Sequence, residues 1–267
     1  MIDSGKPLRT IAVVSDEPYI PWELMVPNRR HGESMERRRA LGVEFAIGRW
    51  INANGSSGPQ KIRLVDSLVV APEYKGRREL KSAKDEADFV STRFPPGQLV
   101  DPANLDHIDQ TLAVTRASLL HFVCHGAESE GEVDQVIYLA DEQPFASTQV
   151  KGLDGFPDFL AKSIPMVFLN ACEVGRPTTA LVGIGGFAKE FIELGASAVI
   201  APLWSVKDSL AHQVALDFYS KALEDPPRPF AEILSEIRAR GYDETIAEDT
   251  YAAYCFYGDP RARRSPS

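Results

Sequence analysis

Cysteine, positive charge and long apolar segments are all scarce in this 267-residue sequence. Three cysteines, an odd number, do not make a disulfide framework, and they indicate a reducing compartment. A net charge of −9 provides no broad basic field for phosphate, which argues against a nucleic-acid partner. No apolar run approaches the ~20 residues of a membrane helix, and the N-terminus lacks the pattern of a signal peptide. We therefore expect a cytoplasmic protein without a membrane partner.

Short apolar runs alternate with helical periodicity along the chain. This alternation predicts an α/β fold around a mostly parallel sheet. We expect one domain over residues 1–260 and a disordered tail over 261–267, because no linker divides the chain. The patterns predict strands over 9–14, 61–70, 117–125, 136–140, 165–172 and 196–203, and helices over 33–51, 78–92, 104–116, 156–163, 187–194, 208–223, 230–240 and 248–257.

Two of the predicted strands end in residues suited to thiol chemistry. The run from Pro165 ends at Cys172 and a turn with Gly175, and the run from Ala117 ends at His125. Parallel sheets present ligands and chemistry at the carboxyl ends of their strands. If these strands are neighbours, a thiol and an imidazole lie over the same edge, as nucleophilic thiol catalysis requires.

Other interpretations of these and nearby residues stay open at this point. A single cysteine at a strand end is often a small core residue. Cys124 alternates to the other strand face, which indicates packing, and Cys255 is expected on an apolar helix face. A zinc site from His121, Cys124, His125 and Cys172 would need ligands from both faces of a strand. The segment 183–186, Gly-Ile-Gly-Gly, could hold phosphate but lacks a Walker lysine and a complete dinucleotide motif, so a tight turn is favoured.

Both strand motifs resemble a known family. His121-Phe-Val-Cys-His-Gly126 and Phe168-Leu-Asn-Ala-Cys-Glu-Val-Gly175 are similar to the two signature strands of CHAT domains, which are caspase-like cysteine peptidases related to separase. Three further segments resemble family motifs in the same order: 20–24 (Ile-Pro-Trp-Glu-Leu), 183–208 and 254–260. The resemblance implies a caspase-like three-layer α/β/α fold.

The resemblance also implies roles for the residues that match. Cys172 would be the nucleophile and His125 its acid–base partner, in a dyad that needs no third residue, cofactor or metal. The backbone N–H groups of Gly126 and Cys172 would form the oxyanion hole. Gly175 lies three residues after the cysteine rather than two, and Glu173 replaces the Arg or Gln usual in caspases, so a preference for Asp substrates is not implied.

A third inference concerns the substrate. Trp204-Ser-Val-Lys-Asp208 resembles a separase segment whose acidic residue receives an arginine side chain, which places Asp208, Trp204 and Glu173 in the substrate-binding region. The acidic loop 128–134 adds negative charge. Asp208 could instead be the N-cap of the helix that it opens.

Partners follow from the resemblance as well. CHAT domains act on protein substrates and usually accompany a sensing region, so we expect a regulatory partner, and the chain could be a fragment. Two alternatives to a peptidase remain: a catalytically silent interaction module of the same fold, and a flavodoxin-like ligand-binding domain. The short segment 176–181 contains no Asp, so we expect the active chain to stay uncleaved there.

Overall fold

The computed structural model describes residues 9–15, 20–31, 34–51, 58–74, 79–128, 135–173, 185–204, 206–244 and 249–265. For residues 29–31, 34–37, 127–128, 135, 172–173 and 185 it describes the backbone alone. A ten-stranded sheet is built from β1 (Thr10–Val14), β4 (Ala46–Trp50), β6 (Ser67–Val70), β7 (Gly97–Leu99), β8 (Leu119–Glu128), β9 (Gln135–Tyr138), β10 (Pro144–Ala146), β11 (Met166–Glu173), β12 (Ala198–Pro202) and β13 (Tyr254–Tyr257). The order is β1-β4-β13-β12-β11-β8-β6-β7, with β9 beside β8 and β10 beside β9.

Most neighbouring strands run parallel, as the sequence predicts. The strands from β12 to β7 form one parallel block. β13 is antiparallel to β12, and β4 and β1 then run parallel to β13. The long strand β8 lies inside the first block, with β6 and β11 paired along its two edges. Its alternate side chains enter the cores on the two faces of the sheet, so most of them are apolar.

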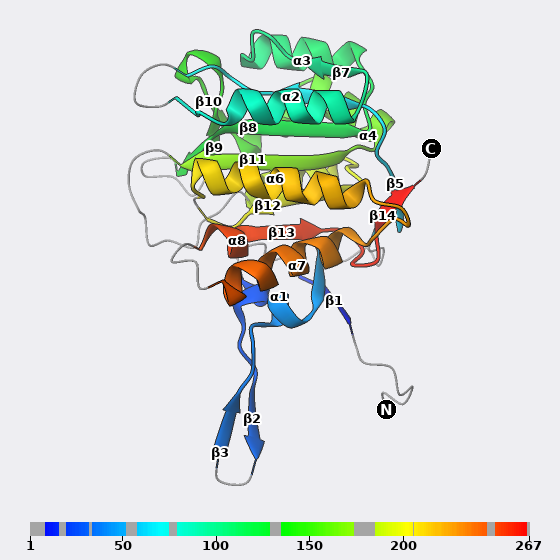
Figure 1. Cartoon of the computed structure of the whole chain (residues 1–267). Helices are drawn as coiled ribbons and strands as arrows, with labels where there is room; N and C mark the ends of the chain where they lie inside the picture. Colours follow the sequence, from blue (N-terminus) through cyan, green and yellow to red (C-terminus); the bar gives the residue numbers. More distant parts are fainter. Residues whose placement is uncertain are drawn as a thin grey trace.

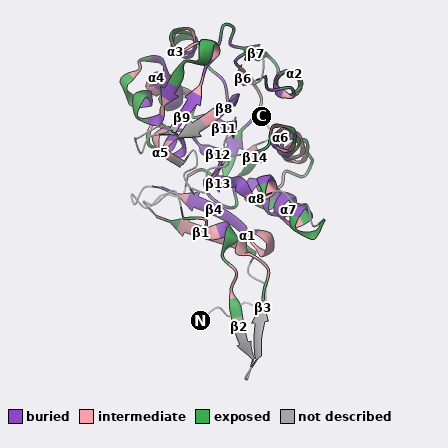
Figure 2. Cartoon of the chain, turned by 90° about the vertical axis from the view of Figure 1, so that its left-hand side faces the viewer, coloured by how far each residue is buried: buried purple, intermediate pink, exposed green. Residues whose placement is uncertain are grey.

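Helices cover both faces of the sheet (Figure 2). One layer contains α3 (Leu105–Val114), α4 (Gly155–Ser163) and α5 (Gly185–Glu193), and the other contains α2 (Ala83–Arg93), α6 (Asp208–Ala222) and α7 (Phe230–Asp243). Each layer encloses its own hydrophobic core. Leu119 and Val123 of β8 enter the core under α2 and α6, whereas Leu120, Phe122 and Cys124 enter the other. The three-layer α/β/α architecture is therefore confirmed.

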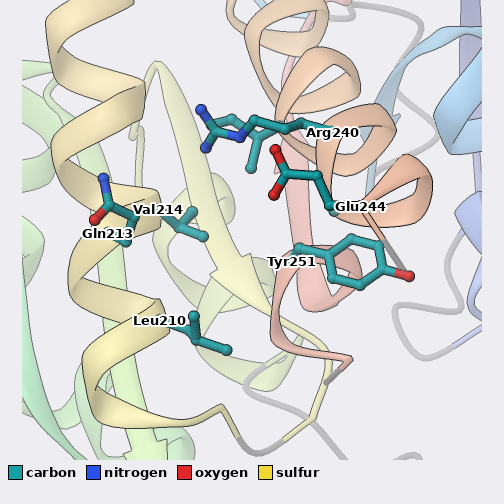
Figure 3. A pocket seen from close by; sticks show the side chains of 8 residues that line it. Leu210, Gln213, Val214, Arg240, Glu244 and Tyr251 are labelled. Atoms are coloured by element: carbon teal, nitrogen blue, oxygen red, sulfur yellow. The ribbon is translucent and has the colours of Figure 1, made fainter. Parts of the chain in front are cut away.

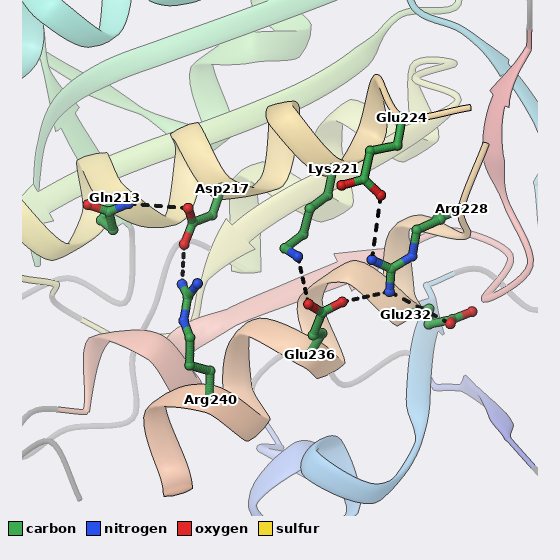
Figure 4. Close-up of polar contacts among 8 residues, drawn as sticks. All are labelled: Gln213, Asp217, Lys221, Glu224, Arg228, Glu232, Glu236 and Arg240. Atoms are coloured by element: carbon green, nitrogen blue, oxygen red, sulfur yellow. Dashed lines mark hydrogen bonds and ion pairs between the residues drawn. The ribbon is translucent and has the colours of Figure 1, made fainter. Parts of the chain in front are cut away.

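Ion pairs join α6 to α7 along their solvent side (Figure 4). Arg240 pairs with Asp217, and Lys221 Nζ lies 2.6 Å from Glu236 Oε1. Arg228 reaches Glu236 at 2.6 Å and lies 3.8 Å from Glu232. Exposed pairs of this kind contribute about 0–1 kcal/mol each, so the apolar contacts beneath them hold the helices together and the pairs fix their alignment.

The N-terminal region departs from the predicted helix over 33–51. It contains an antiparallel hairpin of β2 (Asn28–His31) and β3 (Ser34–Arg37), the short α1 (Leu41–Glu44) and then β4. The hairpin projects away from the sheet (Figure 1). Gly48 of β4 explains part of the difference, because a Cβ there would lie 2.4 Å from the carbonyl oxygen of Gly258. This close approach belongs to a strand paired between β1 and β13, and helical spacing of apolar residues does not reveal it.

A buried ion pair fastens the Pro-Trp-Glu-Leu segment to the sheet. Glu23 lies in the short 3-10 helix η1 (Trp22–Leu24), and Arg49 of β4 donates to it through Nε at 3.0 Å and through Nη2. Burial, the largest influence, would raise the pKa of Glu23, but Arg49, the Arg238 charge and a backbone hydrogen bond together hold it below its usual value. Breaking such a pair on one side leaves a buried charge, which is strongly destabilising.

Three predictions near the C-terminus and in the second strand are wrong. The segment 248–257 is not one helix: α8 (Thr250–Ala253) leads into β13, which puts Cys255 in a strand. Arg263–Ser265 of the expected disordered tail form β14, which pairs with β5 (Lys61–Arg63). The predicted strand over 61–70 is accordingly two strands, β5 and β6, in different sheets. In each case pairing with a distant segment outweighs the local pattern.

Candidate active site

The strands that carry His125 and Cys172 are direct neighbours. β8 and β11 pair in parallel, and the register sets Cys172 opposite His125 and Glu173 opposite Gly126. Both positions lie near the carboxyl ends of their strands, the edge at which parallel sheets place ligands. The expected adjacency of the two strands is confirmed by this register. On its other side Gly126 faces Ile137 of β9.

The side chain of His125 packs against a tyrosine. Its side chain is buried, with 3% of the residue exposed. The ring of Tyr74 lies 4.3 Å from the imidazole, centroid to centroid, with the planes tilted by 45°. The Tyr74 hydroxyl accepts a hydrogen bond of 3.1 Å from the His125 backbone N–H and donates one to the Tyr138 carbonyl. The imidazole therefore has a packed neighbour, and the backbone that carries it has a fixed partner.

A buried polar network contacts β8 and β11 a few residues before His125 and Cys172. Glu86 of α2 is 1% exposed, and its Oε1 accepts from Asn170 Nδ2 at 2.7 Å and lies 2.8 Å from His121 Nε2. His121 Nδ1 lies 2.9 Å from the Tyr219 hydroxyl. Tyr254 donates to Asn170 Oδ1. Every one of these groups has a polar partner, as a buried network needs in order to be stable.

The charges in this network set its pKa values. Burial, the largest influence, would raise the pKa of Glu86, but the contacts with His121, His212 and Asn170 hold it below its usual value. His212 Nδ1 lies 3.5 Å from Glu86 Oε2, and this ion pair raises the pKa of His212. Burial together with the Glu86 charge raises the pKa of Tyr219 well above its ordinary value. The network therefore contains a charged carboxylate at neutral pH.

Two features of the sequence indicate this network, although neither belongs to the motifs described above. Glu86 lies on the apolar face of its helix, between Ala83 and Val90. His121 interrupts an apolar strand, at an even spacing from His125 that places both on one face. A charged or polar residue at a core position is informative because such groups are rarely buried without partners.

Two of the residues assigned to substrate binding, Asp208 and Trp204, lie at the start of α6 and after β12, and the third, Glu173, ends β11. Asp208 is the first residue of α6, but the N-cap is Lys207, which makes no side-chain capping bond. The N-cap alternative for Asp208 is therefore wrong. The Asp208 carboxylate instead accepts a hydrogen bond of 3.4 Å from the backbone N–H of Ser82, the residue before α2.

Trp204 lies between the two cores and contacts both. Its Nε1 is buried and has no hydrogen-bond partner among the residues that the structure describes. The side chain of Glu173, most of the acidic loop (129–134), the segment 176–181 and residues 183–184 lie outside the described residues.

The two other cysteines are core residues. Cys124 and Cys255 are free and fully buried, and burial raises the pKa of both thiols. Cys124 packs in the core opposite the His125 face, as predicted. His121 is bonded to Glu86 and Tyr219. Within the described part of the chain, no group of three or more His, Cys, Asp or Glu side chains could hold a metal ion.

A separate pocket opens where α6 and α7 diverge (Figure 3). Its volume is about 300 Å³. The lining residues come from α6, α7 and α8: Leu210, Gln213, Val214, Ile237, Arg240, Gly241, Glu244 and Tyr251. Gly241 permits the ring of Tyr251 to approach α7, since a Cβ at this position would meet the ring at 2.3 Å.

No helix in the described ranges is both long and apolar enough to span a membrane.

Comparison with known protein families shows to which family the chain belongs. A family model of the CHAT domain matches residues 3–258. The chain belongs to the CHAT family. Among curated protein sequences, none matches it.

Solved structures show the same fold at low identity. The Arg-specific cysteine proteinase gingipain R is 16% identical, with a TM-score of 0.61 over 98% of this chain and 65% of that one. The complex of pro- and mature domains of RgpB from Porphyromonas gingivalis is 15% identical, with a TM-score of 0.63 over 98% of this chain and 67% of that one. A chain described as a protease is 13% identical, with a TM-score of 0.54 over 82% of this chain and 56% of that one. This CHAT chain spans about two thirds of the length of the gingipain chains and shares their cysteine-peptidase fold.

Proposed function

We propose that this CHAT protein is a cysteine endopeptidase with Cys172 as its nucleophile and His125 as its acid–base partner. The observation that carries the proposal is the register of β8 and β11, in which the backbones of these two residues lie opposite each other at the carboxyl edge of the sheet. The caspase-like fold of the family supports a peptidase over a flavodoxin-like binding domain.

The chemistry follows from the two groups. The thiolate of Cys172 attacks the peptide carbonyl, and the imidazolium of His125 protonates the leaving amine. The acyl-enzyme is then hydrolysed by water that His125 activates as a base. Backbone N–H groups of Gly126 and Cys172 stabilise the oxyanion. No cofactor takes part in this sequence of steps.

The specificity and regulation of the site belong to the same proposal. We assign Asp208, Trp204 and Glu173 to the region that receives the side chain before the scissile bond, and a carboxylate there favours arginine through its bidentate geometry. The description of gingipain R as Arg specific supports this assignment. A sensor protein or domain would control access of the protein substrate.

Iodoacetamide labelling tests the dyad in the intact chain. Cys172 should alkylate much faster than Cys124 and Cys255, which are fully buried with raised thiol pKa values. His125→Ala should slow the labelling of Cys172 alone, and Cys172→Ala should abolish cleavage of a peptide library while the thermal melt is unchanged. Slow labelling of all three cysteines would favour the silent interaction module. Cleavage by the Cys172→Ala variant would exclude the mechanism.

A further inference from the structure

Tyr74 is the described side chain in closest ring contact with His125. It follows β6, the strand beside β8, so the chain delivers it to the same carboxyl edge as His125. The residue is 9% exposed, and it packs in the core under α2 and α6.

We propose that Tyr74 is a positioning residue for His125, an inference that rests on the proposed peptidase function. Two independent contacts carry it: the phenol ring against the imidazole, and the hydroxyl on the His125 backbone. Each contact restricts a different part of the histidine, and each predicts a different experimental effect.

The ring contact acts on the imidazole itself. With ring centroids 4.3 Å apart, the phenol blocks one side of the imidazole and restricts its rotation. An acid–base partner must keep one orientation in order to exchange a proton with the thiol and with the leaving amine. The contact therefore holds the imidazole in the orientation that catalysis uses.

The hydroxyl acts on the backbone. It bridges the N–H of His125 and the carbonyl of Tyr138, and these two residues face each other across β8 and β9. The bridge fixes the strand immediately before Gly126, whose N–H is proposed to bind the oxyanion. Displacement of a reacting group by about 1 Å can cost 10²-fold in rate, so a fixed backbone here affects catalysis directly.

A tyrosine that only fills the core would behave differently. Its replacement would lower stability, but it would leave the alkylation rate of Cys172 and the turnover of the folded enzyme unchanged. The alkylation profile and a separation of kcat from KM therefore distinguish positioning from packing.

The test compares Tyr74→Leu, which removes the ring and the hydroxyl, with Tyr74→Phe, which removes only the hydroxyl. Tyr257→Phe is the matched control, because Tyr257 is also a buried tyrosine but lies away from the dyad. In the sheet it faces Val199, which is level with Val167 and Leu120. These two residues precede Cys172 and His125 by five positions on their strands. His125→Ala is the reference. The readouts are the rate of Cys172 alkylation by iodoacetamide from pH 5 to 9, and kcat and KM on a peptide that the wild type cleaves.

We expect Tyr74→Leu to lower the rate of Cys172 alkylation about tenfold, in the direction of His125→Ala, because an imidazole that rotates freely faces the thiol less often. Tyr74→Phe keeps the ring and should keep the alkylation rate, but it should lower kcat about three- to tenfold with KM unchanged. Tyr257→Phe should match the wild type in every readout.

Several results would overturn the inference. A folded Tyr74→Leu variant with a wild-type profile excludes the ring effect. If Tyr74→Leu does not fold, Tyr74→Phe decides, and a wild-type kcat in that variant rejects the positioning role. Failure of this inference is distinct from failure of the proposed function: if His125→Ala itself leaves Cys172 alkylation unchanged, the dyad is wrong and the role of Tyr74 falls with it.

Discussion

Asn170, which lies two residues before Cys172 on β11, donates a hydrogen bond of 2.7 Å to Glu86 of α2. The same carboxylate oxygen lies 2.8 Å from His121, which is on β8 four residues before His125. One buried oxygen thus contacts both strands of the proposed dyad. This arrangement links the relative position of the strands to a single ionised group.

The first prediction is that Glu86→Gln destabilises the fold. An amide can keep the oxygen that faces Asn170 and His121, but it removes the buried negative charge that strengthens both contacts, and its NH₂ group replaces the oxygen that faces His212. Hydrogen bonds to charged groups contribute about 1.5–3 kcal/mol each, so we expect a loss of about 2–3 kcal/mol in the free energy of unfolding. Urea denaturation followed by circular dichroism measures it.

Glu232→Gln is the matched control for this experiment. The Glu232 side chain is half exposed and lies 3.8 Å from Arg228. Loss of such an exposed pair should change stability by less than about 0.5–1 kcal/mol. If the two variants unfold at the same urea concentration, Glu86 does not hold the strands.

The second prediction concerns the pH dependence that His212 gives to stability. Its pKa is raised in the folded protein by the carboxylate of Glu86, 3.5 Å away. A group with a raised folded pKa stabilises fully below its unfolded pKa, about 6.5, and loses that contribution as the pH rises through the folded value. The difference in unfolding free energy between wild type and His212→Ala should therefore be largest below about pH 6 and decline toward alkaline pH.

The Glu86→Gln background provides the control, because it removes the largest of the charges that raise the pKa of His212, while Asp85 and Asp208 remain. There, the effect of His212→Ala should vary less with pH over this range. Denaturation at pH 5.5, 7 and 9 is sufficient. A difference that stays constant with pH in the wild-type background would show that His212 contributes through packing rather than through its charge.

The third prediction concerns the pocket between α6 and α7. Gly241→Ala would normally favour a helix by about 1 kcal/mol, but the added Cβ would meet the Tyr251 ring at 2.3 Å. We expect net destabilisation, by about 1–3 kcal/mol as for other overpacked sites. In a Tyr251→Ala background the same substitution should become neutral or stabilising. A double-mutant cycle by thermal melting checks the sign change, and purely additive effects would exclude the steric explanation.

The strands of the proposed dyad could be predicted from the sequence because their apolar runs are continuous and end in turn residues. The runs that end at His125 and Cys172 follow this pattern, and β8 and β11 contain both residues. The register that sets the two residues opposite each other is a tertiary property. It follows from how the strands pack, and the sequence supported it only through family resemblance.

The errors occur where distant segments pair. Ala46–Trp50 reads as the end of a helix but forms a strand between β1 and β13. Tyr254–Tyr257 likewise continues an apparent helix and instead pairs with β12. Tyr74 and Glu86 were missed for another reason: their roles depend on contacts with residues tens of positions away, and neither lies in a motif.

The last prediction separates two roles of Asp208. The Asp208 carboxylate accepts from the backbone N–H of Ser82, and Asp208→Asn keeps an oxygen that can accept that bond while it removes the charge. If the carboxylate receives a substrate arginine, Asp208→Asn should lower cleavage of Arg-containing peptides by about one to two orders of magnitude, since a charged hydrogen bond contributes about 1.5–3 kcal/mol. Alkylation of Cys172 should be unchanged.

Asp208→Ala is the companion variant, because it removes both the charge and the acceptor. It should lose Arg cleavage to the same degree as Asp208→Asn and in addition unfold at lower urea, since the start of α2 loses its bond to α6. Equal loss of stability in both variants, with cleavage following stability, would mean that Asp208 serves the contact between α2 and α6 alone. A wild-type preference for an apolar residue before the scissile bond, measured on a peptide library, would remove Asp208 from the substrate site altogether.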